Sequence, residues 1–346
     1  MKTEDLRNEY ISPAYVVFKC KDTIIPEYLF LVMKSSIFNN LIKENTTGSV
    51  RQTLSYDNLA KIKIPVPDLS IQKKLISEYN LLISQYNENE KNIHNRKNNL
   101  EKYVFSELGI EETQIEKDPN ILQIVSYKDI HFWGYDKIIN KLPFIFNKYK
   151  PYCFNNKPNW IKGLFRGKSP KYKDSNIYIL NQKCNRVNEI NITYAKSVDE
   201  SWVKTINDKN LTRENDILIN STGEGTIGRA SLIKKDYTGY AYDSHVLLLR
   251  LNLKEVNPEL IVYLINSKFG KKQVEMYKGA QATKQTELGV ENVKKLLFPL
   301  PCIENQNDLA LYIRKEEDEI RSLSKKNAYL KELSNLKFEK EIFDEA

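Results

Sequence analysis

Residues 63–72 read KIPVPDLSIQ and residues 297–306 read LFPLPCIENQ. Each stretch holds two prolines separated by one residue, and each ends in a glutamine. Proline fixes its own backbone and keeps the preceding residue extended, so each pair predicts an irregular segment that ends where a helix can begin. The agreement indicates that one structural unit occurs twice in the chain.

The repeat extends upstream of both proline pairs. The stretch from about Ile25 to Leu75 recurs from about Asn257 to Leu309, 231 to 234 residues later. Its order predicts a helix, a glycine loop, a short helix, the proline pair and a long helix. The matched positions are Pro26, Glu27 and Leu29 with Pro258, Glu259 and Ile261; Ser36 and Phe38 with Ser267 and Phe269; Gly48 with Gly279; Gln52, Thr53 and Leu54 with Gln285, Thr286 and Leu288; Asn58 with Asn292; and Gln72 with Gln306.

A long polar segment with an apolar seam follows each proline pair. The apolar residues recur at heptad spacing, and each helix should exceed about 35 residues, or roughly 50 Å. Since neither helix can bury its seam alone, we expect the two to pair with each other. Asn89 and Asn327 on these seams either fix the register or are solvated. The expected pairing residues are Leu75, Tyr79, Leu82, Tyr86, Ile93, Leu309, Ile313, Ile320, Leu323 and Leu330.

The segment between the helices, residues 111–302, changes to short apolar stretches with turn signals, which predict strands. We therefore expect an α+β fold, in which mixed α/β domains are joined to two long helices that form an antiparallel coiled coil. Trp160 and Trp202 are expected in the core or at its rim. Candidate strands are Ile177–Leu180, Asp216–Asn220, Ala230–Ile233 and His245–Leu251.

Three loops of this segment carry side chains suited to a polyanion. The first, residues 165–172, combines cations, glycine and an aromatic residue, which suits phosphate contact or a solvated basic loop equally. The third, residues 278–285, holds amide, hydroxyl and ammonium groups that can pair with base edges or phosphates. The candidates for nucleic-acid contact from all three loops are Arg166, Lys168, Ser169, Lys171, Tyr172, Ser221, Thr222, Gly223, Arg229, Lys278, Gln281, Thr283 and Lys284.

The second loop, residues 221–229, contains Gly223, Gly225 and Gly228 in the GxGxxG spacing of a dinucleotide-binding loop. That motif needs a helix that begins at the glycines and points its N-terminus at a pyrophosphate. Here the next segment is a strand candidate, with no room for a crossover helix. We therefore interpret the loop as a glycine-rich hairpin that either lets a partner approach closely, with Arg229 on a phosphate, or is purely structural.

Composition limits the class of protein. The chain of 346 residues is 41% hydrophobic, enough for two or three domains, and its formal charge of +8 is compatible with a polyanionic partner. Its start lacks the apolar core of a secretory signal and no stretch reaches the length of a membrane span, so a cytoplasmic protein is expected. The dispersed cysteines and histidines predict thiols and no metal site. We find no Walker loop or aminomethyltransferase motif, and no spacing that compels a nuclease centre.

In its repeat, proline pairs, trailing glutamines and long helices, the chain resembles the DNA-specificity subunits of type I restriction and modification systems over essentially its whole length. The resemblance implies two target-recognition domains, each reading half of a split target in the major groove. Each domain is followed by a long helix, and the two helices pack antiparallel as a spacer. Further matching pieces are Asn159 and Trp160, residues 167–169, Asp216–Leu218 before Gly223–Arg229, and Pro299–Pro301 before Gln306.

The resemblance also implies partners. Modification subunits that methylate adenine with S-adenosylmethionine, and restriction subunits that use ATP and Mg for translocation and cleavage, would assemble with this chain on double-stranded DNA. The chain itself would bind no cofactor and would hold no catalytic residue.

One departure from the family pattern concerns the first recognition domain. The second module has about 100 residues before the repeated part, whereas the first has about 24. Either a second copy of the chain or a complementing half from another chain completes the first domain, or the chain is a non-functional fragment. The expected division is a remnant of the first recognition domain at 1–69, a spacer helix at 70–110, a complete second recognition domain at 111–302 and a spacer helix at 303–346.

Two other classes of function stay open. A free-standing DNA endonuclease predicts metal-dependent cleavage by the purified chain, and the lack of a clustered acidic motif argues against it. An interaction protein whose helix pair organises partners predicts that reversing the charge at Arg166, Lys168 and Arg229 leaves DNA affinity unchanged.

Overall fold

The computed structural model describes residues 17–46, 54–113, 142–280 and 286–343. The chain forms two compact units, the first made of residues 1–97 and 318–346 and the second of residues 98–317. Both division points lie inside long helices, so each unit contains part of both. These helices have 40 and 41 residues, which confirms the expected lengths, and they are α4 (Leu69–Leu108) and α10 (Ile303–Phe343).

Within the first unit, α4 and α10 run antiparallel. The rings of Tyr79 and Phe338 meet edge to face with centroids 6.2 Å apart. Further along α4, Nδ2 of Asn327 donates to the backbone oxygen of Tyr86 at 3.1 Å and to Oε1 of Glu90 at 2.7 Å. Asn327 is 2% exposed, so it is a buried polar contact that favours one register of the pair and not a solvated position.

The residues expected to pair differ in their surroundings: Leu75 and Tyr79 share a cluster with Phe338 of α10, whereas Leu309 and Ile313 pack in the core of the second unit. Leu75, Ile93, Leu309, Ile313, Ile320 and Leu330 are buried, and Tyr79, Leu82, Tyr86 and Leu323 are half-buried.

Three short helices pack beside the helix pair in the first unit. Tyr28 and Phe38 from these helices share an apolar cluster with Leu75 and Phe338. The helices are α1 (Pro26–Lys34), α2 (Ser36–Asn45) and α3 (Tyr56–Lys61).

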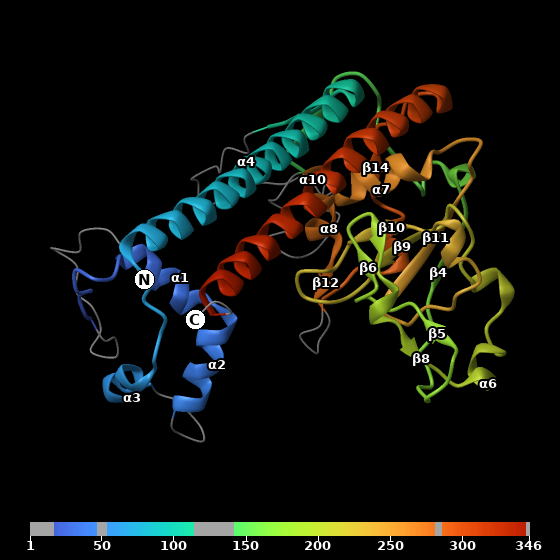
Figure 1. Cartoon of the computed structure of the whole chain (residues 1–346). Helices are drawn as coiled ribbons and strands as arrows, with labels where there is room; N and C mark the ends of the chain where they lie inside the picture. The colour runs from blue at the N-terminus through green and yellow to red at the C-terminus, as the bar shows by residue number, and fades with distance from the viewer. Residues whose placement is uncertain (1–16, 47–53, 114–141, 281–285, 344–346) are drawn as a thin grey trace, which may run out of the picture. The chain divides into compact units, whose positions relative to one another are not determined.

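The second unit is built on an antiparallel sheet with strand order β10-β9-β11-β4 (Figure 1). Helix α7 (Pro258–Asn266) covers one face of the sheet, and its apolar residues join the main core together with Leu309 and Ile313 of α10. Trp160 is 7% exposed in this core, as expected. The strands are β4 (Ile161–Arg166), β9 (Ile217–Asn220), β10 (Ala230–Leu232) and β11 (Val246–Leu251), which confirms three of the strand candidates.

The second unit also contains shorter helices and strands. One of these strands, β5, lies within the fourth strand candidate, Ile177–Leu180. The helices are α6 (Glu200–Val203), α8 (Lys268–Tyr277) and α9 (Val290–Val293). The strands are β1 (Ile110–Glu112), β2 (Phe144–Phe146), β3 (Tyr152–Cys153), β5 (Tyr178–Ile179), β6 (Asn185–Arg186), β7 (Glu189–Ile190), β8 (Lys196–Ser197), β12 (Gly279–Ala280), β13 (Thr286–Glu287) and β14 (Leu297–Phe298).

An ion pair that the sequence analysis did not identify anchors one end of the sheet. Asp216, which precedes β9, accepts hydrogen bonds from Nε and Nη2 of Arg250 at 2.8 and 2.7 Å. Both side chains are largely buried, and Arg250 also donates to the backbone oxygens of Lys209 and Leu211. Because four hydrogen bonds hold the guanidinium group and both carboxylate oxygens of Asp216 accept from it, this pair fixes the start of β9 against the end of β11.

The repeated glutamine makes the same contacts in both units. Oε1 of Gln72 accepts from the backbone N–H of Ile25, and its Nε2 donates to the backbone oxygens of Thr23 and Pro67. Gln306 repeats this pattern, with its Oε1 accepting from the N–H of Asn257 and its Nε2 donating to the oxygens of Glu255 and Pro301. Both glutamines are buried. The sequence repeat is therefore a repeat of hydrogen-bonded structure.

The structure corrects one part of the expected alignment. Ser35 ends α1 and its hydroxyl accepts from the N–H of Phe38, whereas Ser267 ends α7 and its hydroxyl accepts from the N–H of Gly270. Ser267 therefore corresponds to Ser35, not to Ser36. The apolar match of Phe38 with Phe269 misled the alignment, because the capping serine fixes the register here.

Replacement of the buried glutamine tests its structural role. We expect Gln306→Ala to lower the free energy of unfolding by about 3 kcal/mol, because each orphaned buried polar group costs about 1–3 kcal/mol. Chemical denaturation of the purified chain measures this change. Asn305→Ala, at an exposed position on the same turn, is the control, and equal losses in both variants would contradict the assignment.

Candidate functional site

The loops at one end of the sheet gather because of its antiparallel register. Leu247 of β11 pairs with Arg166 of β4 and with Ile219 of β9. The segment after β4, the loop after β9 and the turn before β11 therefore all lie at this end. Two of the three loops singled out from the sequence meet here.

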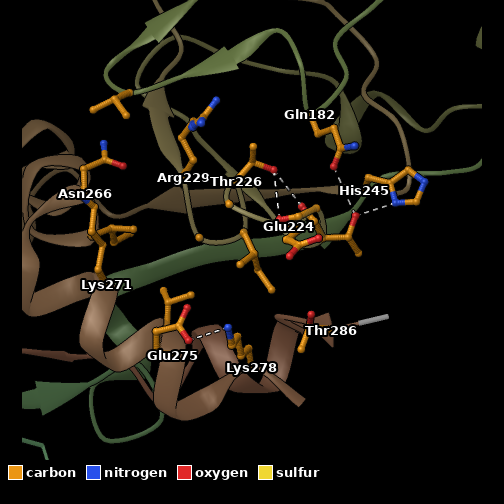
Figure 2. A pocket seen from close by; sticks show the side chains of 18 residues that line it. Gln182, Glu224, Thr226, Arg229, His245, Asn266, Lys271, Glu275, Lys278 and Thr286 are labelled. Carbon is orange, nitrogen blue, oxygen red and sulfur yellow. Dashed lines mark hydrogen bonds and ion pairs between the residues drawn. The ribbon is translucent and has the colours of Figure 1, made fainter. Parts of the chain in front are cut away.

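A groove with a volume of about 840 Å³ lies at this end of the sheet (Figure 2). One wall is the loop of residues 222–229, and another is formed by Lys271 and Glu275 of α8 and by Lys278, which directly follows this helix. Gln182, His245 and Thr286 lie along its rim. The charges are mixed, since Glu224 faces the same space and Lys278 forms an ion pair with Glu275 at 2.5 Å.

The glycine loop joins two antiparallel neighbours. Ile219 of β9 pairs with Ala230 of β10, so the loop is a hairpin connection. Gly223, Gly225 and Gly228 have φ values of 101°, 72° and 78°. These left-handed conformations favour glycine. The hairpin interpretation is confirmed, and the dinucleotide-loop interpretation stays rejected because no helix begins at these glycines.

Two asparagines that sequence reasoning missed hold the base of this loop. Nδ2 of Asn185 donates to Oδ1 of Asn220 and to the backbone oxygen of Arg229, both at 2.9 Å. Nδ2 of Asn220 donates in turn to the backbone oxygen of Gln182 at 3.1 Å. Asn185 and Asn220 are both fully buried. The only signal in the sequence was an asparagine at the end of an apolar strand. No characteristic spacing to a second residue distinguished it from other asparagines.

The first loop is largely exposed and contacts the turn before β11. Lys168 and Ser169 are exposed, and the hydroxyl of Ser169 lies 3.5 Å from that of Ser244. Arg166 is held by Glu287 at 2.5 Å and by the backbone oxygen of Ser244.

The outer part of this loop carries a cation and an aromatic ring. Lys171 lies 3.9 Å from the carboxylate of Asp199. Tyr172 is 52% exposed, with the ammonium group of Lys196 4.9 Å from its ring centroid.

The remaining candidates divide by accessibility. Ser221 is buried with its hydroxyl directed into the fold, so it is corrected from a contact residue to a scaffold residue. Arg229 is half-buried, and burial lowers the pKa of its guanidinium group below the ordinary arginine value, with Arg186 acting in the same direction. Gln281, Thr283 and Lys284 lie outside the described residues.

The turn before β11 presents His245 at the groove rim. Oδ1 of Asp243 accepts from the backbone N–H of His245 at 2.9 Å, and the backbone oxygen of His245 accepts from the N–H of Ser221 at 2.9 Å. Asp243 is 4% exposed, and burial raises the pKa of its carboxyl group. His245 and Lys271 escaped the sequence analysis because isolated residues outside a motif give no signal of their position in the fold.

Neither a metal site nor a membrane span is apparent in the described parts of the chain. No three histidine, cysteine, aspartate or glutamate side chains there are grouped to hold a metal ion. No described helix combines the length and apolarity that crossing a bilayer requires. The four cysteines are free thiols, as expected.

Comparison with known proteins identifies the family. The model of the type I restriction modification DNA specificity domain matches residues 6–102 and 161–332. The chain belongs to this family. It is accordingly a DNA-specificity subunit of a type I restriction-modification system, and its partners in general are DNA and the modification and restriction subunits of such a system. No curated protein matches the chain.

Solved structures also match the chain at low sequence identity. A chain from a study of complex assembly and conformational transition in the type I restriction-modification system has a TM-score of 0.51 at 12% identity, covering 91% of this chain and 70% of that one. The HsdS subunit of Thermoanaerobacter tengcongensis gives 0.42 at 12% identity, with coverage of 92% and 70%. The S subunit from M. genitalium gives 0.48 at 10% identity, with coverage of 93% and 74%.

A methyl group at Gly228 tests the rigidity of the glycine loop. A Cβ there would lie 2.6 Å from Cγ2 of Val274 on α8, at a φ that side chains rarely adopt. We expect Gly228→Ala to destabilise the chain by about 1–3 kcal/mol, measured by thermal unfolding. The control is Gly289→Ala, where a Cβ meets no atom within 4 Å, and its thermal unfolding midpoint should be nearly that of the unaltered chain. If Gly289→Ala lowers the midpoint as much as Gly228→Ala does, the packing argument is contradicted.

Proposed function

We propose that the second unit contacts its DNA target with the end of the sheet that carries the groove. The observation that carries this proposal is the glycine loop, held at its base by Asn185 and Asn220, at the same end of the antiparallel sheet as the exposed Lys168. Contacts that recognise a sequence need side chains in fixed positions, because a loosely held donor discriminates poorly between base edges.

The charge distribution supports two kinds of contact. Lys168, in the segment after β4, and Lys271, on α8 in the groove wall, are both exposed, so they can meet phosphates without first breaking a buried pair. The groove itself combines amide, hydroxyl, imidazole and carboxylate groups with the cations Arg229, Lys271 and Lys278. Such a mixture of donors and acceptors suits base edges as well as the phosphates beside them.

In this proposal, the chain recognises the target sequence and its partner subunits carry out the reactions. Modification subunits would bind S-adenosylmethionine and methylate adenine, and restriction subunits would bind ATP and Mg. The first unit, residues 1–97 and 318–346, would contribute to assembly through the helix pair. Whether it also reads DNA with a completing partner is tested by the symmetry of the methylated motif.

Charge reversal tests the phosphate contacts. We expect Lys168→Glu and Lys271→Glu each to weaken DNA binding and to reduce the slope of log affinity against log salt by about 1. Titration of a labelled duplex with the purified chain, at several salt concentrations, measures both quantities.

Lys254→Glu provides the matched control, because Lys254 is exposed beyond the opposite end of β11 and changes the net charge equally. If all three variants weaken DNA binding alike, the affinity depends only on the net charge of the chain and the proposed surface is wrong. Metal-dependent cleavage of DNA by the chain alone would overturn the proposal that catalysis belongs to the partner subunits.

A further inference from the structure

His245 stands apart from the other polar groups of the groove because its backbone is fixed on both sides. The N–H is held by the buried carboxylate of Asp243, and the carbonyl oxygen is held by the N–H of Ser221 in the adjoining loop. Its side chain is nevertheless exposed at the rim. An exposed ring on a fixed backbone is poised to meet another molecule.

The ring is also held through one of its nitrogen atoms. Nδ1 of His245 lies 2.8 Å from the hydroxyl oxygen of Thr222, and that oxygen lies 3.5 Å from Oε1 of Gln182. Figure 2 shows Gln182 and His245 on the same side of the groove. Three side chains from three separate segments therefore form one chain of polar contacts.

This chain of contacts favours the neutral form of the ring with its proton on Nδ1. The amide oxygen of Gln182 only accepts hydrogen bonds, and the Thr222 hydroxyl has a single proton. Both contacts are satisfied together when Thr222 donates to Gln182 and accepts from Nδ1–H of His245. The opposite nitrogen, Nε2, is then an unprotonated acceptor in the neutral ring. Within the described residues, no hydrogen bond engages Nε2.

We propose that His245 is a base-reading residue, and that Thr222 is a positioning residue that presents Nε2 of His245 as an acceptor for an exocyclic amino group. In the major groove, that donor belongs to adenine or cytosine, whereas guanine and thymine present only acceptors at the corresponding positions. The inference rests on the proposed function, since it assigns one base contact within that surface.

Substitution of His245 and Thr222 tests the assignment through sequence preference. The full chain, co-purified with its modification subunits, is used to select bound duplexes from a random pool. We expect His245→Ala to reduce the preference for adenine or cytosine at one position from about tenfold to nearly none, while the other positions keep theirs. Thr222→Val should relax the same position, and Thr222→Ser, which keeps the hydroxyl, should restore it.

The outcomes separate this inference from the proposed function. A purely structural role for the two residues would lower thermal stability or overall affinity and leave the selected motif unchanged, which overturns the inference. If an analogue that lacks the exocyclic amino group, such as purine in place of adenine at the relaxed base pair, binds the unaltered chain as well as the natural base does, the acceptor assignment is overturned. If Lys168→Glu and Lys271→Glu also leave DNA binding unchanged, the proposed function itself fails.

Discussion

The buried amide side chain at the start of each long helix is the constraint on which the rest of the fold depends. Gln72 and Gln306 each join three backbone groups, two from the segment before a short helix and one from the proline pair. Each amide thereby closes a loop of about 50 residues and sets where the long helix begins. Such closure has a large entropic cost, which hydrogen bonds in a buried site offset more effectively than exposed ones.

Much of the architecture could be predicted because it repeats or is periodic. The heptad seam gave the lengths and the pairing of α4 and α10, and short apolar stretches between turn signals gave β9, β10 and β11. One register error came from matching Phe38 with Phe269, since apolar residues are interchangeable along a helix whereas a capping serine is not. The division into recognition domains stays a prediction, because packing groups the chain differently, with part of each long helix in each unit.

The site was less predictable, for a physical reason. A sequence shows a cluster of glycines directly, and such a cluster indicates a turn that needs positive φ angles. The loop at residues 221–229 could therefore be predicted. His245, Gln182 and Lys271 come from distant segments, and only the register of the sheet brings them to the same groove. Ser221 was expected to contact DNA because it opens the glycine loop, but its hydroxyl is buried.

The buried contact of Asn327 with Tyr86 and Glu90 limits how the helix pair can vary in length. Each residue inserted into a helix rotates everything beyond it by about 100°, so seven residues nearly restore the original face while two or five turn the seam toward water. A change in one helix also needs a matching change in the other, or Asn327 loses its acceptors. Both helices must therefore change length together. Natural variants of the pair should differ by about seven residues in each helix.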